Sequence, residues 1–160
     1  FCGYITNVSI TIQFMALVAS GDMDFIKVHA NELSSRDSIT SGDIIRVLET
    51  PFDKERVYQE IRKNVDLLEP TISIYIGDSV TDLLCMLACD MGIIIGSSSS
   101  LKKVAHSFGI SLVPLYKETL RLMKVRHSQG WQKTKGVLYT VSSWHEIYTF
   151  MVGLSCPHQT

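Results

Sequence analysis

Asp78 and Asp82, four residues apart, are the side chains whose types and spacing best suit a metal ion. They follow the apolar run Ile72–Ile76, which is rich in β-branched residues and predicts a buried strand. Gly77 ends this strand, and apolar residues at helical spacing then predict a helix that begins near Ser79. Ligands bind outside the carboxyl ends of parallel strands. Two carboxylates one helical turn apart at such a place predict a shared site for Mg²⁺.

The alternative is that these aspartates only shape the chain. An aspartate after a strand is also a common turn former and helix cap, and a single one would favour that role. The whole pattern Gly-Asp-x-x-x-Asp, placed between an apolar strand and an apolar helix, favours the metal.

Composition narrows the class of protein. The chain has 160 residues, 46% hydrophobic and 19% charged, which suits one domain with an ordinary core. A net charge of −1 without a basic stripe predicts no nucleic-acid partner, and no apolar run is long enough to predict a membrane span. The four cysteines have no metal spacing and are predicted to be reduced thiols of an intracellular protein. They are Cys2, Cys85, Cys89 and Cys156.

Predicted strands and helices alternate along the chain, which indicates a parallel sheet covered on both faces. The predicted strands are residues 3–8, 25–29, 43–48, 72–76, 91–95, 110–114 and 137–141. Helices are predicted for residues 10–19, 51–68, 101–108 and 116–126, after Ser79 and after Ser142 as the capping residue, and residues 34–42 are predicted to form a polar turn. We expect one core domain over residues 1–153 and a tail over 154–160.

Two further side chains complete a predicted phosphate site. Thr6 stands at the tip of the first strand, and Lys54 stands in the first turn of helix 51–68. Either residue alone is usually a local cap or a solvated charge. Together, a hydroxyl and an ammonium group can bind phosphoryl oxygens while the carboxylates hold Mg²⁺. The serine run Ser97–Ser100 is either a second phosphate-binding helix start or only a turn and cap.

With these motifs the chain resembles the haloacid dehalogenase superfamily of phosphatases. In that resemblance Thr6 matches the second motif, Lys54 the third, and Asp78 with Asp82 the fourth. Longer stretches are similar to the C-terminal phosphatase domain of plant bifunctional thiamine-biosynthesis proteins, in which a thiaminase-II-like domain precedes a thiamine monophosphate phosphatase. These stretches are residues 28–33, 75–85, 95–101 and 138–144, within a resemblance that runs from about residue 19 to 152.

The resemblance implies a three-layer α/β/α, Rossmann-like core that is truncated at its N-terminus. It implies a Mg²⁺-dependent phosphomonoesterase acting on thiamine monophosphate, with Thr6 and Lys54 on the phosphate and Asn31 and Ser79 near the substrate. A fused or associated thiaminase-II-like domain is the implied partner. The implied location is cytoplasmic, or mitochondrial or plastid if an upstream transit peptide exists.

One motif of the family is missing. No Asp-x-Asp, the family's nucleophile and acid/base pair, follows an apolar strand before Thr6. Asp22-Met23-Asp24 has the letters, but it lies in a turn between the second and third motifs and is not the nucleophile. Since the chain opens with Phe1 and strand-like residues, we expect it to begin inside a domain, with the first motif and a cap upstream. Two alternatives stay open: an inactive module that binds a ligand or partner, and a phosphatase for another small phosphate ester.

Overall fold

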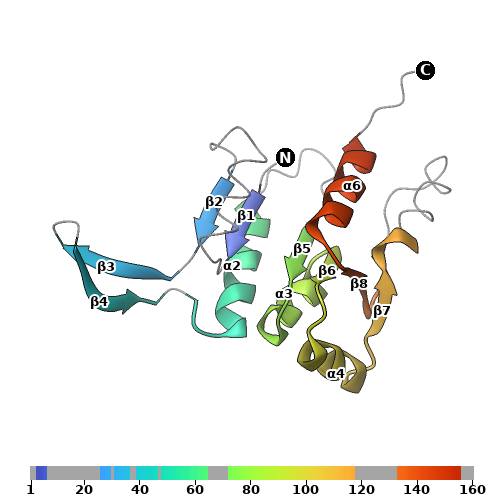
Figure 1. Cartoon of the computed structure of the whole chain (residues 1–160), viewed down its shortest axis with the longest axis horizontal. Helices are drawn as coiled ribbons and strands as arrows, with labels where there is room; N and C mark the ends of the chain where they lie inside the picture. Colours follow the sequence, from blue (N-terminus) through green and yellow to red (C-terminus); the bar gives the residue numbers. More distant parts are fainter. Residues whose placement is uncertain are drawn as a thin grey trace. The chain divides into compact units, whose positions relative to one another are not determined.

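The computed structural model describes residues 3–6, 26–29, 31–36, 39–46, 48–64, 72–117 and 133–155. The chain divides into two compact units, residues 1–57 and 58–160, and each is described by itself. Figure 1 labels the elements along the chain. The predicted helices over residues 10–19 and 116–126 lie largely or wholly outside the described residues.

The first unit contains a short parallel pair of strands. Strand β1 (Gly3–Thr6) pairs with β2 (Ile26–His29), which confirms both predicted strands. Thr6 and His29 are register partners at the carboxyl ends of the two strands. Position 6 therefore lies at the edge of this small sheet where a parallel pair would receive a ligand.

A β-hairpin follows, where the sequence predicted a polar turn over residues 34–42. Strand β3 (Glu32–Arg36) pairs antiparallel with β4 (Ile39–Ile45), so the turn prediction was wrong. The pairing shifts register inside the hairpin, where Gly42 has a positive φ of 87° and the Ser41 hydroxyl donates to the Ser34 carbonyl (3.2 Å). The turn-forming residues thus shape a bulge within β4.

Helix α2 (Pro51–Asn64) begins with a reciprocal cap. The backbone N–H of Asp53 donates to the Thr50 hydroxyl (3.2 Å), and the Asp53 carboxylate accepts from the Thr50 N–H (2.9 Å). The Thr50 hydroxyl also donates to this carboxylate (2.8 Å), and the hydrogen bonds from the Thr50 hydroxyl and N–H lower the pKa of Asp53. Thr50 is thus the N-cap residue that precedes the helix, and Asp53 completes a capping box with it.

The second unit is built on a four-stranded parallel sheet with the order β5-β6-β8-β7, which Figure 1 shows side by side. Its strands are β5 (Ile74–Gly77), β6 (Met91–Ile95), β7 (Ser111–Pro114) and β8 (Val137–Val141). The sheet is open, and the predicted α/β architecture with a parallel sheet is confirmed.

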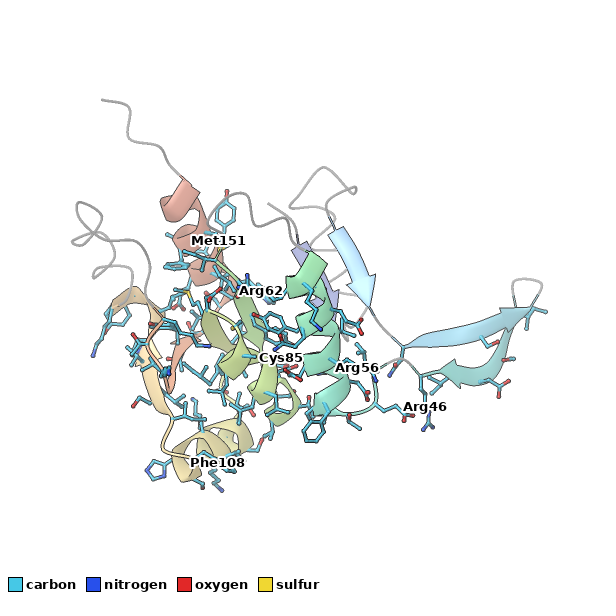
Figure 2. All side chains as sticks on the ribbon, turned by 180° about the vertical axis from the view of Figure 1, so that it is seen from behind. Arg46, Arg56, Arg62, Cys85, Phe108 and Met151 are labelled. Atoms are coloured by element: carbon cyan, nitrogen blue, oxygen red, sulfur yellow. The ribbon has the colours of Figure 1, made fainter. Side chains whose placement is uncertain are left out.

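Apolar cores cover both faces of this sheet. On one face Ile93 and Tyr139 pack with Ile147 and Phe150 of α6 (Trp144–Ser155). On the other face Ile94 and Leu138 pack with residues of two helices. These helices are α3 (Leu83–Ala88) and α4 (Ser99–Ser107). Cys85 on α3 and Met151 on α6, both labelled in Figure 2, belong to the two helical layers.

The unit thus has the predicted three layers, because β-strand residues alternate between faces and both faces of the strand are apolar. Gly92 on β6 allows α3 to pack closely, since a Cβ there would lie 2.4 Å from the Met86 carbonyl oxygen. Helix α6 continues past Gly153 to Ser155, into the predicted tail. Within the part of the chain that the structure describes, no helix is both long and apolar enough to cross a membrane.

Candidate functional site

The paired aspartates lie where the chain leaves β5. The strand ends at Gly77, Asp78 and Ser79 form the loop, and one 3₁₀ turn, η1 (Val80–Asp82), leads directly into α3. The backbone N–H of Asp82 donates to the Ser79 carbonyl (3.1 Å) and closes this turn. The strand–loop–helix order predicted from the sequence is therefore confirmed.

Asp82 is buried, with 7% of the residue exposed, and its carboxylate is held from two sides. Its Oδ2 atom accepts hydrogen bonds from the backbone N–H (3.2 Å) and the hydroxyl (2.7 Å) of Ser79. Its Oδ1 atom accepts from the hydroxyl of Tyr75 (3.3 Å). These bonds fix the orientation of the carboxylate between the loop and the strand.

Gly77 is required by the same packing. A Cβ atom at this position would lie 2.5 Å from the Cβ of Asp82 and 2.9 Å from its Cγ. Contacts this short do not occur between real side chains, so the absence of a side chain at residue 77 lets Asp82 fold back against the end of the strand. The glycine of the motif is therefore explained by close approach.

Asp78 has the opposite environment. It is exposed, and among the described residues no hydrogen bond or ion pair engages its carboxylate. The neighbouring hydroxyls of Ser79 and Thr81 lie 2.7 Å apart. The loop therefore offers carboxylate and hydroxyl oxygens, which are the ligands of hard cations.

This donor set fits Mg²⁺, which commonly takes one or two protein carboxylates and completes its shell with waters and substrate phosphate oxygens. Within the described ranges, no group of three or more His, Cys, Asp or Glu side chains could hold a metal together. Asp78 and Asp82 would be the residues that hold the cation.

The other predicted site residues belong to the first unit. Lys54 lies in the first turn of α2 and is buried, with 6% of the residue exposed, although lysines are rarely buried unless they are paired. Thr6 ends β1. Thr6 and Lys54 are thus placed at a strand end and a helix start, as predicted, and their convergence with Asp78 and Asp82 stays a prediction.

Asn31 has an evident local role. Its side-chain amide donates to the Leu48 carbonyl (3.0 Å), and its side-chain oxygen accepts from the Leu48 N–H (2.7 Å). Since residues 31 and 48 flank the β3–β4 hairpin, these two bonds hold the base of the hairpin closed. Its predicted place near a substrate stays a prediction.

The serine run starts α4. The Ser98 hydroxyl accepts from the Leu101 N–H (3.4 Å) and lies 3.2 Å from the Ser100 hydroxyl, so the capping interpretation is confirmed. The phosphate interpretation of the same residues stays a prediction.

A second polar network, at the amino end of β5, was missed by the sequence reasoning. The Asp90 carboxylate accepts from the N–H (2.8 Å) and the hydroxyl (2.6 Å) of Ser73 and forms an ion pair with Arg62 (3.8 Å). The hydroxyl of Tyr58 lies 3.0 Å from that of Ser73. Burial raises the pKa of Asp90, but the Ser73 hydrogen bonds and the nearby cations outweigh it and hold the pKa below its ordinary value.

The two described cysteines, Cys85 and Cys89, are free and buried, as predicted, whereas Cys2 and Cys156 lie outside the described residues. Cys89 donates its thiol hydrogen to the Met86 carbonyl (3.2 Å). Burial raises the pKa of the Cys89 thiol to about 11. This thiol therefore stays protonated near neutral pH and is a packing group.

Comparison with known proteins identifies one strong similarity. The chain is 43% identical over 145 residues to the "Bifunctional TH2 protein, mitochondrial" of Arabidopsis thaliana. The match covers 86% of this chain and 24% of that protein, so the chain spans about a quarter of the length of the relative. This similarity confirms the resemblance to plant bifunctional proteins. No family model and no solved structure matches the chain.

Proposed function

We propose that this chain is the cation- and phosphate-binding part of a Mg²⁺-dependent phosphomonoesterase of thiamine metabolism. The observation that carries the proposal is the loop after β5, where an exposed and a buried carboxylate, Asp78 and Asp82, follow a parallel strand within one helical turn. The similarity to a bifunctional TH2 protein supports the metabolic assignment.

Each proposed role follows from side-chain chemistry. Asp78 and Asp82 hold Mg²⁺, which when bound neutralises charge on the phosphoryl oxygens. Lys54 and Thr6 bind those oxygens, and Lys54 stabilises the charge of the transferring group. Asn31 and Ser79 lie close to the substrate in this proposal.

The nucleophile comes from outside these 160 residues in this proposal, because no Asp-x-Asp follows an apolar strand within them. A carboxylate oxygen of that aspartate bonds to phosphorus while the ester P–O bond breaks, and the acid/base aspartate of the same motif gives its proton to the leaving oxygen, so that an alcohol departs. Water then attacks the aspartyl phosphate and gives a proton back to the acid/base aspartate, which releases inorganic phosphate and restores the nucleophilic carboxylate.

The proposed substrate is thiamine monophosphate, and a thiaminase-II-like domain is the proposed partner. Both rest on the resemblance of residues 28–33 and 95–101 to the plant proteins, whereas the cation-binding role rests on the loop after β5. The name of the relative places that protein in the mitochondrion, and we propose an organellar location for this chain as well.

The test compares the 160-residue chain with a chimera in which it is joined to the segment that precedes the matching region in the Arabidopsis relative. Release of inorganic phosphate from thiamine monophosphate and from p-nitrophenyl phosphate is measured with Mg²⁺ and with EDTA. We expect turnover by the chimera only, and loss of about 100-fold in kcat/KM for Asp78→Asn, as is typical when metal binding is impaired. Glu60→Gln, at an exposed position of α2, is the matched carboxylate control.

The outcomes separate the parts of the proposal. Full activity in EDTA would remove the metal and the roles of both aspartates. Equal hydrolysis of the two esters would remove thiamine monophosphate and leave a phosphatase for another ester. Inactivity of a folded chimera would favour the binding module, and turnover by the chain alone would require a different nucleophile.

A further inference from the structure

The carboxylate loop is tied to β5 by one side chain that lies outside the motif. Tyr75 is the second residue of β5 and pairs in register with Gly92 on β6. Its hydroxyl donates to Oδ1 of Asp82, seven residues later in the chain. Two further donors to Asp82 belong to Ser79, inside the loop itself, and both reach Oδ2.

The position of Tyr75 is in turn fixed by α2. The rings of Tyr58 and Tyr75 meet edge to face, with centroids 6.5 Å apart and planes at 84°. The hydroxyl of Tyr58 lies 3.0 Å from that of Ser73, the residue immediately before the same strand. Such T-shaped pairs are favourable beyond the area that they bury, so the Tyr75 ring has a defined orientation.

We propose that Tyr75 is a positioning residue for the cation site: its hydroxyl fixes the Asp82 carboxylate and thereby sets the affinity of the loop for the cation. This inference rests on the proposed function, since it concerns the same two aspartates. It adds a residue that the Gly-Asp-x-x-x-Asp pattern does not contain.

The physical reason is that hydrogen bonds to both oxygens restrain the Asp82 carboxylate more than hydrogen bonds to one oxygen. The two bonds from Ser79 both reach one oxygen of the carboxyl group. The bond from Tyr75 reaches the second oxygen from a residue on a rigid strand, and it therefore restricts rotation of the group about the first oxygen. Some residues form a hydrogen bond to a metal ligand but do not touch the metal. Removal of such a residue typically weakens metal affinity by 10- to 100-fold.

The matched pair of variants is Tyr75→Phe and Tyr58→Phe. Each removes one hydroxyl from the same pair of rings and keeps the edge-to-face contact, but only Tyr75→Phe removes a bond to Asp82. The variants are made in the 160-residue chain, and melting temperatures are recorded to show that both stay folded.

Two readouts are used. Amide hydrogen exchange without metal reports the Ser79 N–H, which is bonded to Oδ2 of Asp82. Titration with Mn²⁺, followed by the paramagnetic resonance signal of the free ion, reports affinity. We expect faster exchange of the Ser79 amide and about tenfold weaker Mn²⁺ binding in Tyr75→Phe, with neither change in Tyr58→Phe.

Unchanged exchange and affinity in Tyr75→Phe would overturn the inference, and so would equal effects of the two variants, which would indicate ring packing. Absence of Mn²⁺ binding by the unmodified chain would overturn the cation site and with it the proposed function, while the exchange result alone judges whether Tyr75 holds Asp82. If Tyr75→Phe does not fold, the hydroxyl proton of Tyr75 in the unmodified chain is measured. Exchange with water as fast as that of Tyr148, which is 64% exposed, would overturn the inference.

Discussion

The two ends of strand β5 carry carboxylates in different surroundings. At the amino end, Asp90 is bonded to Ser73 and paired with Arg62 (3.8 Å), a cation supplied by the chain. At the carboxyl end, the buried Asp82 carboxylate accepts from the amide and hydroxyl of Ser79 and the hydroxyl of Tyr75, and Asp78 stands exposed beside it.

This difference separates a structural from a functional use of the same residue type. A carboxylate that finds a cation and several donors within its own fold stabilises that fold and offers little to a ligand. Two carboxylates on one loop repel each other, and a bound cation relieves that repulsion. We therefore expect Asp90 to serve stability, and we propose that the exposed Asp78, with Asp82, serves binding.

The largest expected effect on stability comes from Gly77→Ala. The new Cβ would lie 2.5 Å from the Cβ of the buried Asp82, so Asp82 has to move or the strand has to shift. We expect a loss of about 2–3 kcal/mol in the free energy of unfolding, measured by urea denaturation, as is usual for overpacking. The control is Gly109→Ala, where φ is +68° and no atom lies within 4 Å of the new Cβ.

The control substitution places an alanine in a left-handed backbone conformation, which lowers the free energy of unfolding by roughly 1 kcal/mol. If Gly77→Ala cost no more than this, Asp82 would be able to leave its position without loss. The carboxylate loop would then be adaptable, and the argument that its geometry is fixed by close packing would fail.

Asp90→Ala is expected to have the next largest effect. It removes the acceptor for the Ser73 N–H and hydroxyl and the partner of Arg62, and hydrogen bonds to a charged group contribute about 1.5–3 kcal/mol. We expect a loss of about 2 kcal/mol in the free energy of unfolding and unchanged Mn²⁺ affinity, since the site lies at the other end of the strand. If Asp90→Ala lost Mn²⁺ affinity as well as stability, the networks at the two ends of β5 would be coupled.

The pH dependence of stability tests the same carboxylate with a smaller effect. The pKa of Asp90 is lowered in the folded chain, so its ionised form stabilises the fold above the ordinary value of about 3.9. This contribution is lost as the pH falls through the lower folded-state value. Asp90→Asn, which does not titrate, should therefore show a shallower decline of the unfolding free energy between about pH 5 and about pH 2. Parallel declines of the two proteins would contradict the assignment.

The sequence alone was sufficient for features that depend on neighbouring residues. Strand β6 was predicted with its observed bounds, Met91–Ile95, because an unbroken apolar run between polar residues can only be buried. The place of Asp78 and Asp82 between a strand and a helix was predicted because a loop after one strand is a local feature. Of the β3–β4 hairpin, the sequence predicted only the end of β4, within the strand over residues 43–48. The rest was missed because its serines and glycine occur more often in turns than in a bulged strand.

Features that depend on distant residues were beyond sequence reasoning. The bond between Ser73 and Asp90 joins residues 17 apart, and nothing local distinguishes Asp90 from a turn aspartate. Strand β8 lies between β6 and β7, an order that periodicity does not specify. Tyr75 was interpreted as a strand aromatic, and its only signal was a hydroxyl in an otherwise aliphatic strand that precedes the loop.

The smallest expected effect on stability, and the sharpest test of the comparison, belongs to Asp78→Asn. Asp78 is exposed, and substitutions at such positions usually change the free energy of unfolding by less than about 0.5 kcal/mol. Mn²⁺ affinity should nevertheless fall by at least about tenfold, because a carboxylate that binds the cation directly has lost its charge. Glu60→Gln, also exposed and equal in charge change, should leave both quantities unchanged.

The opposite pattern would reverse the assignment of the two ends. A loss of more than about 1 kcal/mol in Asp78→Asn, with little change in Mn²⁺ binding, would mean that Asp78 supports the fold as Asp90 does. The argument depends on the ratio of the two effects within one variant, since a carboxylate kept for binding costs the fold little when it is removed. Asp90→Ala should therefore lower the free energy of unfolding and leave Mn²⁺ affinity unchanged. Asp78→Asn should lower Mn²⁺ affinity and leave the free energy of unfolding nearly unchanged.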